Sequence, residues 1–383
     1  MIFQKNILIT ILAFSCLCSV AQDSLPRMVP NDSLVTYAQS VIDEYQIPGL
    51  QIALVSDDQI VNIAAVGVRK LGGAPLSTSD YMHLGSCGKA MTGYLAAVLA
   101  EKGYISWSTT LEEIFPEWSG HMQPAYRNAS LQELLSHQSL LPPFVDLAAW
   151  ETLALIKGKT PRKRRSNFVK WVVQQTVIPF DSSDLAAGHR YSNAGYAVAA
   201  AMLEKVMDQS WEELMDTWVF TPMKIEARMG WPAKANAQQP FGHQVDTVSG
   251  ILKPHAPDDS YQIDPILSPA GNISMSIGDY ARFIQWQLKG LHGSIPGFDK
   301  AFFEFLHYGN QPDSEYAIGW YGVDQFADQV SSHTGSADTF YCLNILLRKH
   351  NFAVIVIANA ATEETKAGAE KVRNFLLRPY LID

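Results

Sequence analysis

LQIALVSDDQIVNIAAVGV, residues 50–68, is the stretch that decides the fold class of this chain. Its two apolar halves, 50–57 and 59–68, are rich in β-branched residues and meet at Asp57-Asp58, so they predict a β-hairpin. Further strand patterns come only near the other end of the chain, at 315–323, 338–348 and 352–358. Strands from both ends of a chain can share one antiparallel sheet, with the segment between them inserted as another layer.

The segment between these strands has mainly helical periodicity. Residues 91–102 predict a helix, and Ser276-Ile277-Gly278-Asp279 resembles a capping box that opens another at 277–289. Further helical patterns lie at 33–46, 131–136, 147–156, 166–176, 194–207, 211–218 and 363–377. Residues 231–270 are rich in Pro, Gly, Gln, His and Asp, which predicts an ordered loop. We therefore expect an α+β fold: an antiparallel sheet from N- and C-terminal strands, flanked by helices, with an inserted mostly helical lobe at about 90–290 and a ligand cleft between the two.

The N-terminus predicts export. Residues 1–21, MIFQKNILITILAFSCLCSVA, place Lys5 before an apolar run that ends in small residues, the order of a secretory signal peptide cleaved after Ala21. The apolar run is short for a membrane-spanning helix, which needs ~20 residues. A membrane anchor and lipid attachment at Cys16 or Cys18 are the alternatives. We expect residues 22–383 to form a single two-lobed unit without a transmembrane segment, in the periplasm or secreted.

Composition narrows the class of protein. The chain has 383 residues and a formal net charge of −9, so nothing favours nucleic acid as a partner, which usually needs a basic face. Cys87 and Cys342 are the cysteines that remain after the expected cleavage. Two cysteines are too few for a disulfide scaffold, so isolated thiols are expected, with a single bridge as the alternative.

Ser86-Cys87-Gly88-Lys89 is the first motif whose residues could carry out catalysis. If Ser86 opens the helix, Lys89 lies one turn on and shares its face. A serine hydroxyl needs a base to take its proton, and a lysine can be that base only if burial lowers its pKa. The helix N-terminus also favours a developing oxyanion. Alone, the motif is more typical of a helix-capping serine followed by a solvated lysine.

Two later motifs complete a set. In Tyr191-Ser192-Asn193, the tyrosine could share proton transfer with Lys89, and Asn193 could hold the lysine and a substrate carbonyl; a buried tyrosine and a helix cap are the alternative. His333-Thr334-Gly335-Ser336 precedes the predicted 338–348 strand. It could offer backbone N–H groups and a side chain to an acyl substrate, with Gly335 permitting close backbone approach, or it could be a simple turn.

The order of these motifs resembles the β-lactamase-related serine hydrolase family, which includes class C β-lactamases, DD-peptidases and related esterases. Three further segments are similar to family segments: ELLSHQSLLP at 133–142 to Leu-Leu-Thr-His-Thr-Ser-Gly-Leu-Pro, SPAGN at 268–272 to Pro-Ala-Gly-Gly, and YAIGW at 316–320 to Tyr-Gly-Leu-Gly-Trp. The resemblance covers roughly residues 34–378.

The resemblance implies a mechanism with an acyl-enzyme and no metal or organic cofactor. Ser86 would be the nucleophile, and Lys89 and Tyr191 the proton-transfer pair. Asn193 would position a small-molecule or peptide substrate. The backbone N–H groups of Ser86 and Ser336 would form the oxyanion hole. His333, Thr334 and Gly335 would line the opposite wall and contact a substrate carboxylate or carbonyl.

Departures from the family pattern refine the expected activity. Class C β-lactamases usually have lysine where this chain has His333, and an imidazole is fully charged only below a pKa of ~6.5. We therefore expect a peptidase- or esterase-like hydrolase of a peptide, amide or ester rather than a true β-lactamase. A non-catalytic binding or scaffold protein on the same fold is the second class. Gln138 and Leu140 replace the usual Thr and Gly, which predicts a different loop geometry, and Cys87 should point away from the face of Ser86.

Other conspicuous residues receive structural interpretations. The basic run KGKTPRKRR at 157–165 predicts a solvated loop between helices. The alternative, functional hypothesis is that this run contacts an anionic cell envelope. His137 and His243 lack the spacing of metal ligands. We expect His137 to be a hydrogen-bonded structural residue.

Overall fold

The structure, a computed structural model, describes residues 30–309, 314–325 and 328–380. The predicted signal peptide at 1–21, with Cys16 and Cys18, lies outside these residues. Within the described ranges, no helix has the length and apolar character needed to cross a bilayer.

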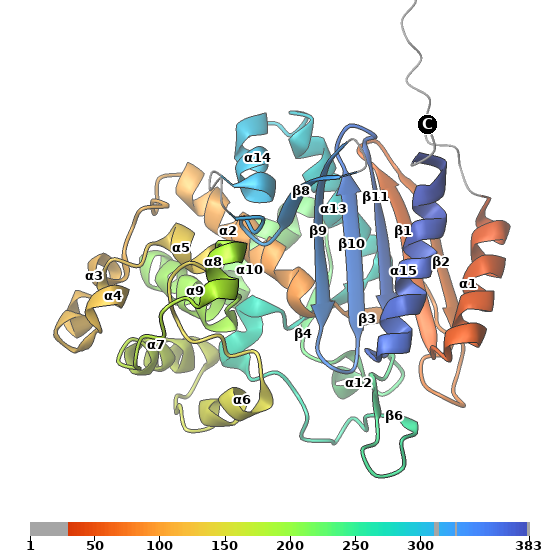
Figure 1. Cartoon of the computed structure of the whole chain (residues 1–383), viewed down its shortest axis with the longest axis horizontal. Helices are drawn as coiled ribbons and strands as arrows, with labels where there is room; N and C mark the ends of the chain where they lie inside the picture. The colour runs from red at the N-terminus through yellow and green to blue at the C-terminus, as the bar shows by residue number, and fades with distance from the viewer. Residues whose placement is uncertain (1–29, 310–313, 326–327, 381–383) are drawn as a thin grey trace, which may run out of the picture.

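A six-stranded antiparallel sheet joins the two ends of the chain, in the order β2-β1-β11-β10-β9-β8 (Figure 1). Its strands are β1 (Gly49–Ser56), β2 (Ile60–Gly67), β8 (Tyr321–Gln325), β9 (Asp328–Ser336), β10 (Tyr341–Leu347) and β11 (Phe352–Ala358). The N-terminal hairpin enters the C-terminal sheet through β1 and β11, where Ile52 lies opposite Val356. The predicted α+β fold, with strands from both termini in one sheet, is confirmed.

Both faces of the sheet are covered, which explains why β1 is buried along its whole length and is mostly apolar. Successive side chains of a strand point to opposite faces. Ile52 and Leu54 pack into one core with α1 (Asn31–Tyr45) and α15 (Glu363–Leu377). Ala53 and Val55 pack into the other core with α2 (Lys89–Glu101) and α13 (Ile277–Leu291). Figure 1 shows α1 and α15 on the outer face of the sheet and the helical region on the other side.

Along the sequence, most of the other helices come between the N-terminal hairpin and the C-terminal strands. The α-helices are α3 (Leu111–Ile114), α4 (Pro124–Arg127), α5 (Leu131–Leu135), α6 (Leu147–Leu153), α7 (Pro161–Val172), α8 (Ser182–Ala187), α9 (Asn193–Met207), α10 (Trp211–Met215), α11 (Thr221–Met223), α12 (Pro232–Ala235) and α14 (Lys300–Tyr308). Shorter helical turns are η1 (Gly85–Gly88), η2 (Pro116–His121), η3 (Asp216–Phe220), η4 (Pro265–Ala270) and η5 (Arg378–Tyr380). Small sheets pair β3 (Tyr81–His83) and β4 (Ala227–Met229) with β7 (Ile273–Ser276), and β5 (His243–Val245) with β6 (Leu252–Pro254). The predicted helices are present, and the lobe boundary at about 90–290 stays a prediction.

The C-terminal strands differ from the prediction at two places. His333 to Ser336 precede β10, as predicted, but they also form the last residues of β9, a strand that the sequence did not predict. The strand predicted at 315–323 begins only at Tyr321. The sequence of β9, DQVSSHTGS, is mostly polar, so it lacks the apolar pattern of a buried strand. Its pairing with β10 on one side and β8 on the other outweighs that weak local preference.

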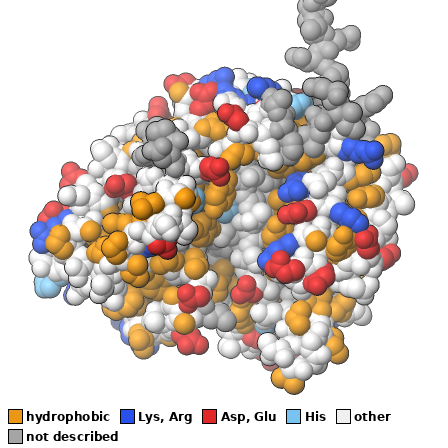
Figure 2. Space-filling view, in the orientation of Figure 1, with side chains coloured by type: hydrophobic (Ala, Val, Ile, Leu, Met, Phe, Trp, Pro, Cys, Tyr) orange, Lys and Arg blue, Asp and Glu red, His pale blue; other side chains and the backbone are white. Residues whose placement is uncertain are grey.

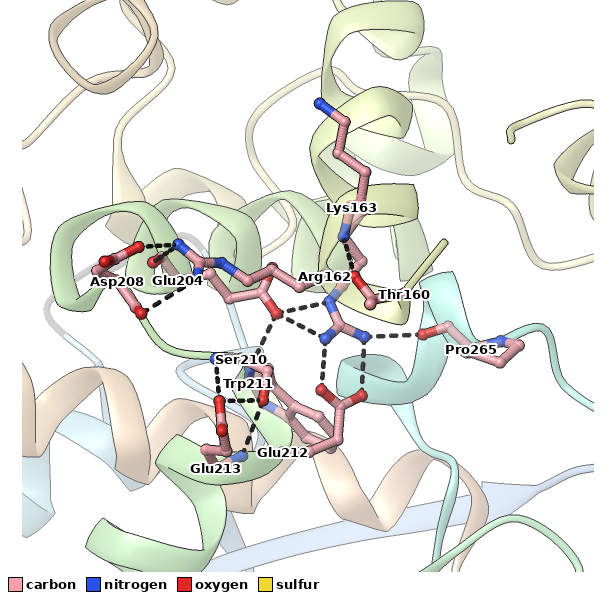
Figure 3. Close-up of polar contacts among 11 residues, drawn as sticks. Thr160, Arg162, Lys163, Glu204, Asp208, Ser210, Trp211, Glu212, Glu213 and Pro265 are labelled. Atoms are coloured by element: carbon pink, nitrogen blue, oxygen red, sulfur yellow. Dashed lines mark hydrogen bonds and ion pairs between the residues drawn. The ribbon is translucent and has the colours of Figure 1, made fainter. Parts of the chain in front are cut away.

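The prediction of a solvated loop at 157–165 is wrong for its second half. Thr160 caps α7 by accepting a hydrogen bond from the N–H of Lys163, so the basic residues that follow are helical. The Arg165 side chain is completely buried and forms ion pairs of 2.6 Å with Glu204 and with Glu212 (Figure 3). The sequence predicted exposure because it does not show that Arg165 pairs with carboxylates on α9 and α10, some forty residues further along the chain.

Candidate active site

Ser86 lies in η1, a tight helical turn between β3 and α2. Gly85 before it has φ +53, a left-handed conformation that glycine adopts without strain. The side chain of His83 supports this turn, because the N–H of Gly85 donates to His83 Nδ1 at 3.1 Å. The turn runs directly into α2, so Ser86 and Lys89 are one helical turn apart.

Two glycines allow other backbone segments to approach Ser86 closely. A Cβ atom on Gly335 in β9 would lie 2.0 Å from the carbonyl oxygen of Leu84 and 2.8 Å from the Ser86 nitrogen. A Cβ atom on Gly271 would lie 2.9 Å from that same nitrogen. Gly335 therefore lies where two backbone segments approach closely, and its contact with substrate stays a prediction. The close approach brings the backbone of Ser336 and the backbone of Ser86 to one wall of the cleft described below.

Lys89 is completely buried, and its ammonium nitrogen contacts three oxygen atoms. Nζ lies 3.2 Å from Ser86 Oγ, 2.7 Å from Asn193 Oδ1 and 2.6 Å from the carbonyl oxygen of Ala270. None of these three partners is a carboxylate. Burial lowers the pKa of Lys89 well below its usual value of 10.5, since the charged form loses its hydration.

The hydrogen bonds of Lys89 are suited to a neutral amine. The two shorter contacts go to amide and carbonyl oxygens, which accept but cannot donate. Asn193 is held in this orientation because its Nδ2 donates to the carbonyl oxygen of Phe144 at 2.8 Å. When Lys89 is neutral, its two N–H groups satisfy these two acceptors and its lone pair is left to accept from the hydroxyl of Ser86. When Lys89 is charged, its third N–H donates to Ser86 Oγ at 3.2 Å.

Tyr191 completes the group around the serine. Its hydroxyl is hydrogen-bonded to the side chain of Ser86, and its ring centroid lies 4.6 Å from Lys89 Nζ. Burial raises the pKa of Tyr191 well above 10, although the hydrogen bond with Ser86 opposes this shift. The phenol therefore keeps its proton at neutral pH and can donate it to a developing charge.

His137 holds the Tyr191 segment in place. The N–H of Ser192 donates to His137 Nδ1 at 3.1 Å, and the His137 ring lies 4.3 Å from that of Tyr191. Burial, with Lys89 nearby, lowers the pKa of His137 well below 6.5, so the ring is neutral and accepts this hydrogen bond. The predicted hydrogen-bonded structural role is confirmed. Leu140, in the same loop, has φ +61, a left-handed conformation that favours glycine.

The His333 side chain turns away from solvent. Only 3% of His333 is exposed. Its Nδ1 lies 2.5 Å from the carbonyl oxygen of Thr334, and its Nε2 lies 3.3 Å from the hydroxyl of Tyr316. Both ring nitrogens are thus engaged within the protein, while Thr334 and Ser336 are exposed. Contact between His333 and substrate stays a prediction.

Cys87 points away from the catalytic group, as expected. Its Sγ lies 3.5 Å from the carbonyl oxygen of His333 and 3.7 Å from that of Cys342. Both cysteines are buried free thiols, so the prediction of isolated thiols is confirmed.

A small cleft opens at Ser86. Its lining residues come from η1, α6, α9, η4 with its flanks, and β9: Ser86, Trp150, Asn193, Ile263, Leu267, Ala270, Gly271 and Ser336. The sequence did not single out Trp150, Ile263 and Leu267, because their spacing is that of ordinary core residues. Ala270, whose carbonyl oxygen binds Lys89, did carry a signal through the SPAGN segment.

Two arginines of α7 fix the segment that forms one wall of this cleft. Arg164 donates two hydrogen bonds of 2.8 Å to Asp264, and Arg165 donates one of 2.9 Å to the carbonyl oxygen of Pro265. These contacts hold the start of η4, and the last residue of η4 is Ala270. The segment that ends at Ala270, whose carbonyl oxygen contacts Lys89, is therefore anchored at its start by α7. Figure 3 shows the contact at Pro265.

The Beta-lactamase family profile matches residues 34–377, so the chain belongs to this family of serine hydrolases, as the sequence motifs predicted. Penicillin-binding protein 4* of Bacillus subtilis (strain 168) is 21% identical over 363 residues, which covers 91% of this chain and 76% of that protein. Penicillin-binding protein 4 of Amycolatopsis lactamdurans is 24% identical over 196 residues, which covers 50% of this chain and only 47% of that protein.

The fold is shared with a solved structure as well. The octameric penicillin-binding protein homologue from Pyrococcus abyssi has a TM-score of 0.70 and 20% identity, covering 91% of this chain and 78% of that one. At this identity the likeness shows the common fold, and the chemistry has to be argued from the residues of this chain.

Proposed function

We propose that this chain hydrolyses a peptide, amide or ester through an acyl-enzyme on Ser86. The observation that carries the proposal is the environment of Lys89: a buried amine 3.2 Å from Ser86 Oγ whose two shorter contacts are to oxygens that only accept. Such an amine can take the proton of the hydroxyl and so turn serine into a nucleophile.

In the acylation step, Ser86 Oγ attacks the carbonyl carbon of the substrate and its proton passes to Lys89 Nζ. The backbone N–H groups of Ser86 and Ser336 stabilise the negative oxygen of the tetrahedral intermediate. As the bond to the leaving group breaks, Tyr191 gives its phenolic proton to that group and regains one from the Lys89 ammonium. The charge of Lys89 is thus transient.

In the deacylation step, water replaces the leaving group beside Tyr191. The water attacks the acyl carbon, and its proton passes through Tyr191 to Lys89. The bond to Ser86 Oγ then breaks, Ser86 regains a proton, and the carboxylic acid leaves.

Peptidase- or esterase-like activity is better supported than β-lactamase activity. A substrate carboxylate needs a cationic or donor side chain, and both nitrogens of His333 are engaged with Thr334 and Tyr316. Two relatives are named penicillin-binding proteins, which makes a fluorescent penicillin a suitable acylating probe. The location we propose, periplasmic or secreted, rests on residues 1–21. N-terminal sequencing of the exported protein tests it, with Gln22 expected as the first residue.

Ester turnover and penicillin labelling together test the proposal. The wild type should hydrolyse p-nitrophenyl acetate and gain a covalent label from fluorescent penicillin, and Ser86→Ala should do neither. Absence of both reactions in a folded wild type would favour the alternative, a non-catalytic binding protein on the same fold.

A further inference from the structure

The wall of the cleft beside Ser86 is apolar and carries no charge among the described lining residues. Trp150, Ile263, Leu267 and Ala270 supply most of its side chains. The polar edge of Trp150 is already used, since its indole N–H donates to the carbonyl oxygen of Phe144 at 2.8 Å. What remains for a ligand is the hydrocarbon part of this indole.

Asn193, the amide side chain that lines the cleft, has a protein partner at each of its polar atoms. Its Oδ1 accepts from Lys89 at 2.7 Å, and its Nδ2 donates to Phe144 at 2.8 Å. A charged group that entered the cleft would lose its hydration and gain no ion-pair partner, which costs free energy. An apolar group would gain by leaving water.

The reaction geometry decides which part of the substrate meets this wall. The leaving group takes its proton from Tyr191, so it departs on the side of that phenol. Tyr191 is not among the residues that line the cleft. With the carbonyl carbon at Ser86 Oγ, the acyl group therefore extends into the cleft.

We propose that this cleft is an acyl pocket that selects an uncharged, apolar acyl group, so that the substrate is an ester or amide of such a group. The inference rests on the proposed function at Ser86. The wall is held in place before substrate arrives, because Arg164 binds Asp264 between Ile263 and η4, and Arg165 binds the carbonyl oxygen of Pro265. A wall that is already ordered costs little further entropy on binding.

A series of p-nitrophenyl esters tests the selectivity, with the uncatalysed rate subtracted. From acetyl through propionyl to butyryl, kcat/KM should rise about fourfold for each methylene group that the cleft buries. The hemisuccinyl ester has as many acyl carbons as butyryl but ends in a carboxylate, and its kcat/KM should be at least about tenfold lower. Equal rates along the acetyl-to-butyryl series, or a preference for hemisuccinyl, would overturn the proposal.

Trp150→Ala tests the wall itself, with Trp118→Ala as the matched control. Both tryptophans are partly buried, but Trp118 stacks on Phe115 away from the cleft. Trp150→Ala should flatten the chain-length preference, and Trp118→Ala should keep it; equal behaviour of the two variants would count against the acyl pocket. Fluorophosphonate labelling separates the two proposals. Labelling of Ser86 without acyl preference refutes the pocket alone, whereas no labelling and no turnover refute the proposed function and, with it, the pocket.

Discussion

Lys89 in α2 and Arg165 in α7 are both completely buried basic side chains, and they differ in what surrounds them. Lys89 contacts a hydroxyl, an amide oxygen and a carbonyl oxygen. Arg165 contacts two carboxylates, those of Glu204 and Glu212, and a carbonyl oxygen. Burial imposes the same kind of desolvation cost on both side chains.

The partners decide which cation keeps its charge. Burial lowers the pKa of Lys89, with no carboxylate among its contacts to oppose the shift. Burial also acts to lower the pKa of Arg165, but Glu204 and Glu212 outweigh it and raise the pKa. Lys89 can therefore exchange a proton during a reaction, whereas Arg165 is a permanent structural charge. Both act on η4, Lys89 at Ala270 and Arg165 at Pro265.

The largest expected effect is on activity at Lys89. Lys89→Ala removes the proposed base and should lower kcat/KM for p-nitrophenyl acetate by about 10²- to 10⁴-fold. The melting temperature should change much less, because removal of a buried amine that lacks a carboxylate partner offsets part of the cost of the cavity. If melting temperature and activity fell together, Lys89 would be a structural residue like Arg165.

At Arg165 we expect the opposite pattern, in which stability is lost first. Arg165→Met leaves Glu204 buried without its cation, which should cost about 3–5 kcal/mol of unfolding free energy in urea titrations. Lys163→Met, an exposed change on the same helix, should stay within about 0.5 kcal/mol. A stable Arg165→Met protein would show that the ion pairs do not hold η4.

The pH dependence of the unfolding free energy should distinguish Lys89 from Arg165, with a smaller effect than the substitutions above. Lys89 has a lowered pKa in the folded protein and a pKa near 10.5 when unfolded. Between these two values the unfolded chain binds the proton that the folded chain lacks, so the unfolding free energy should rise with pH. The rise is up to about 1.4 kcal/mol per pH unit, and it ends above 10.5.

Lys89→Met is the variant that isolates this effect. The difference in unfolding free energy between wild type and Lys89→Met should grow with pH through that window, measured by urea titration at several pH values. A difference that is constant with pH would mean that Lys89 has the same proton affinity in both states, and so is not held neutral.

The smallest expected effect is at Glu212, the more exposed of the two carboxylates that pair with Arg165. Glu212 is 28% exposed, whereas Glu204 is 3% exposed. Glu212→Gln keeps the shape of the side chain and leaves Arg165 paired with Glu204, so it should cost only about 1 kcal/mol. Glu204→Gln should cost more, and the reverse order in urea titrations would contradict the assignment of Glu204 as the main partner.

The sequence predicted the parts of the fold that repeat a local pattern. The runs at 50–68 and 352–358 are apolar and β-branched enough to identify buried strands, and they form β1, β2 and β11. The polar strand β9 was not predicted, because its stability comes from pairing with β8 and β10 rather than from its own residues.

The sequence motifs predicted the central residues of the candidate site, but not the residues that form the cleft around them. Ser86, Lys89, Tyr191 and Asn193 meet around one amine, as the motif order implied. Trp150 and Leu267 could not be distinguished from core residues by spacing, because a cleft wall and a core have the same apolar pattern. Arg165 was misread because sequence does not show which carboxylates lie across a tertiary contact.

Covalent labelling measured by intact mass tests the central claim, that a neutral Lys89 activates Ser86, most directly. With a fluorophosphonate, the wild type should gain the mass of one adduct, mapped by peptide digestion to Ser86. Lys89→Ala should label far more slowly while remaining folded, and Ser86→Ala should stay unlabelled. An adduct that persists on Ser86→Ala, or Lys89→Ala labelling at the wild-type rate, would contradict the account.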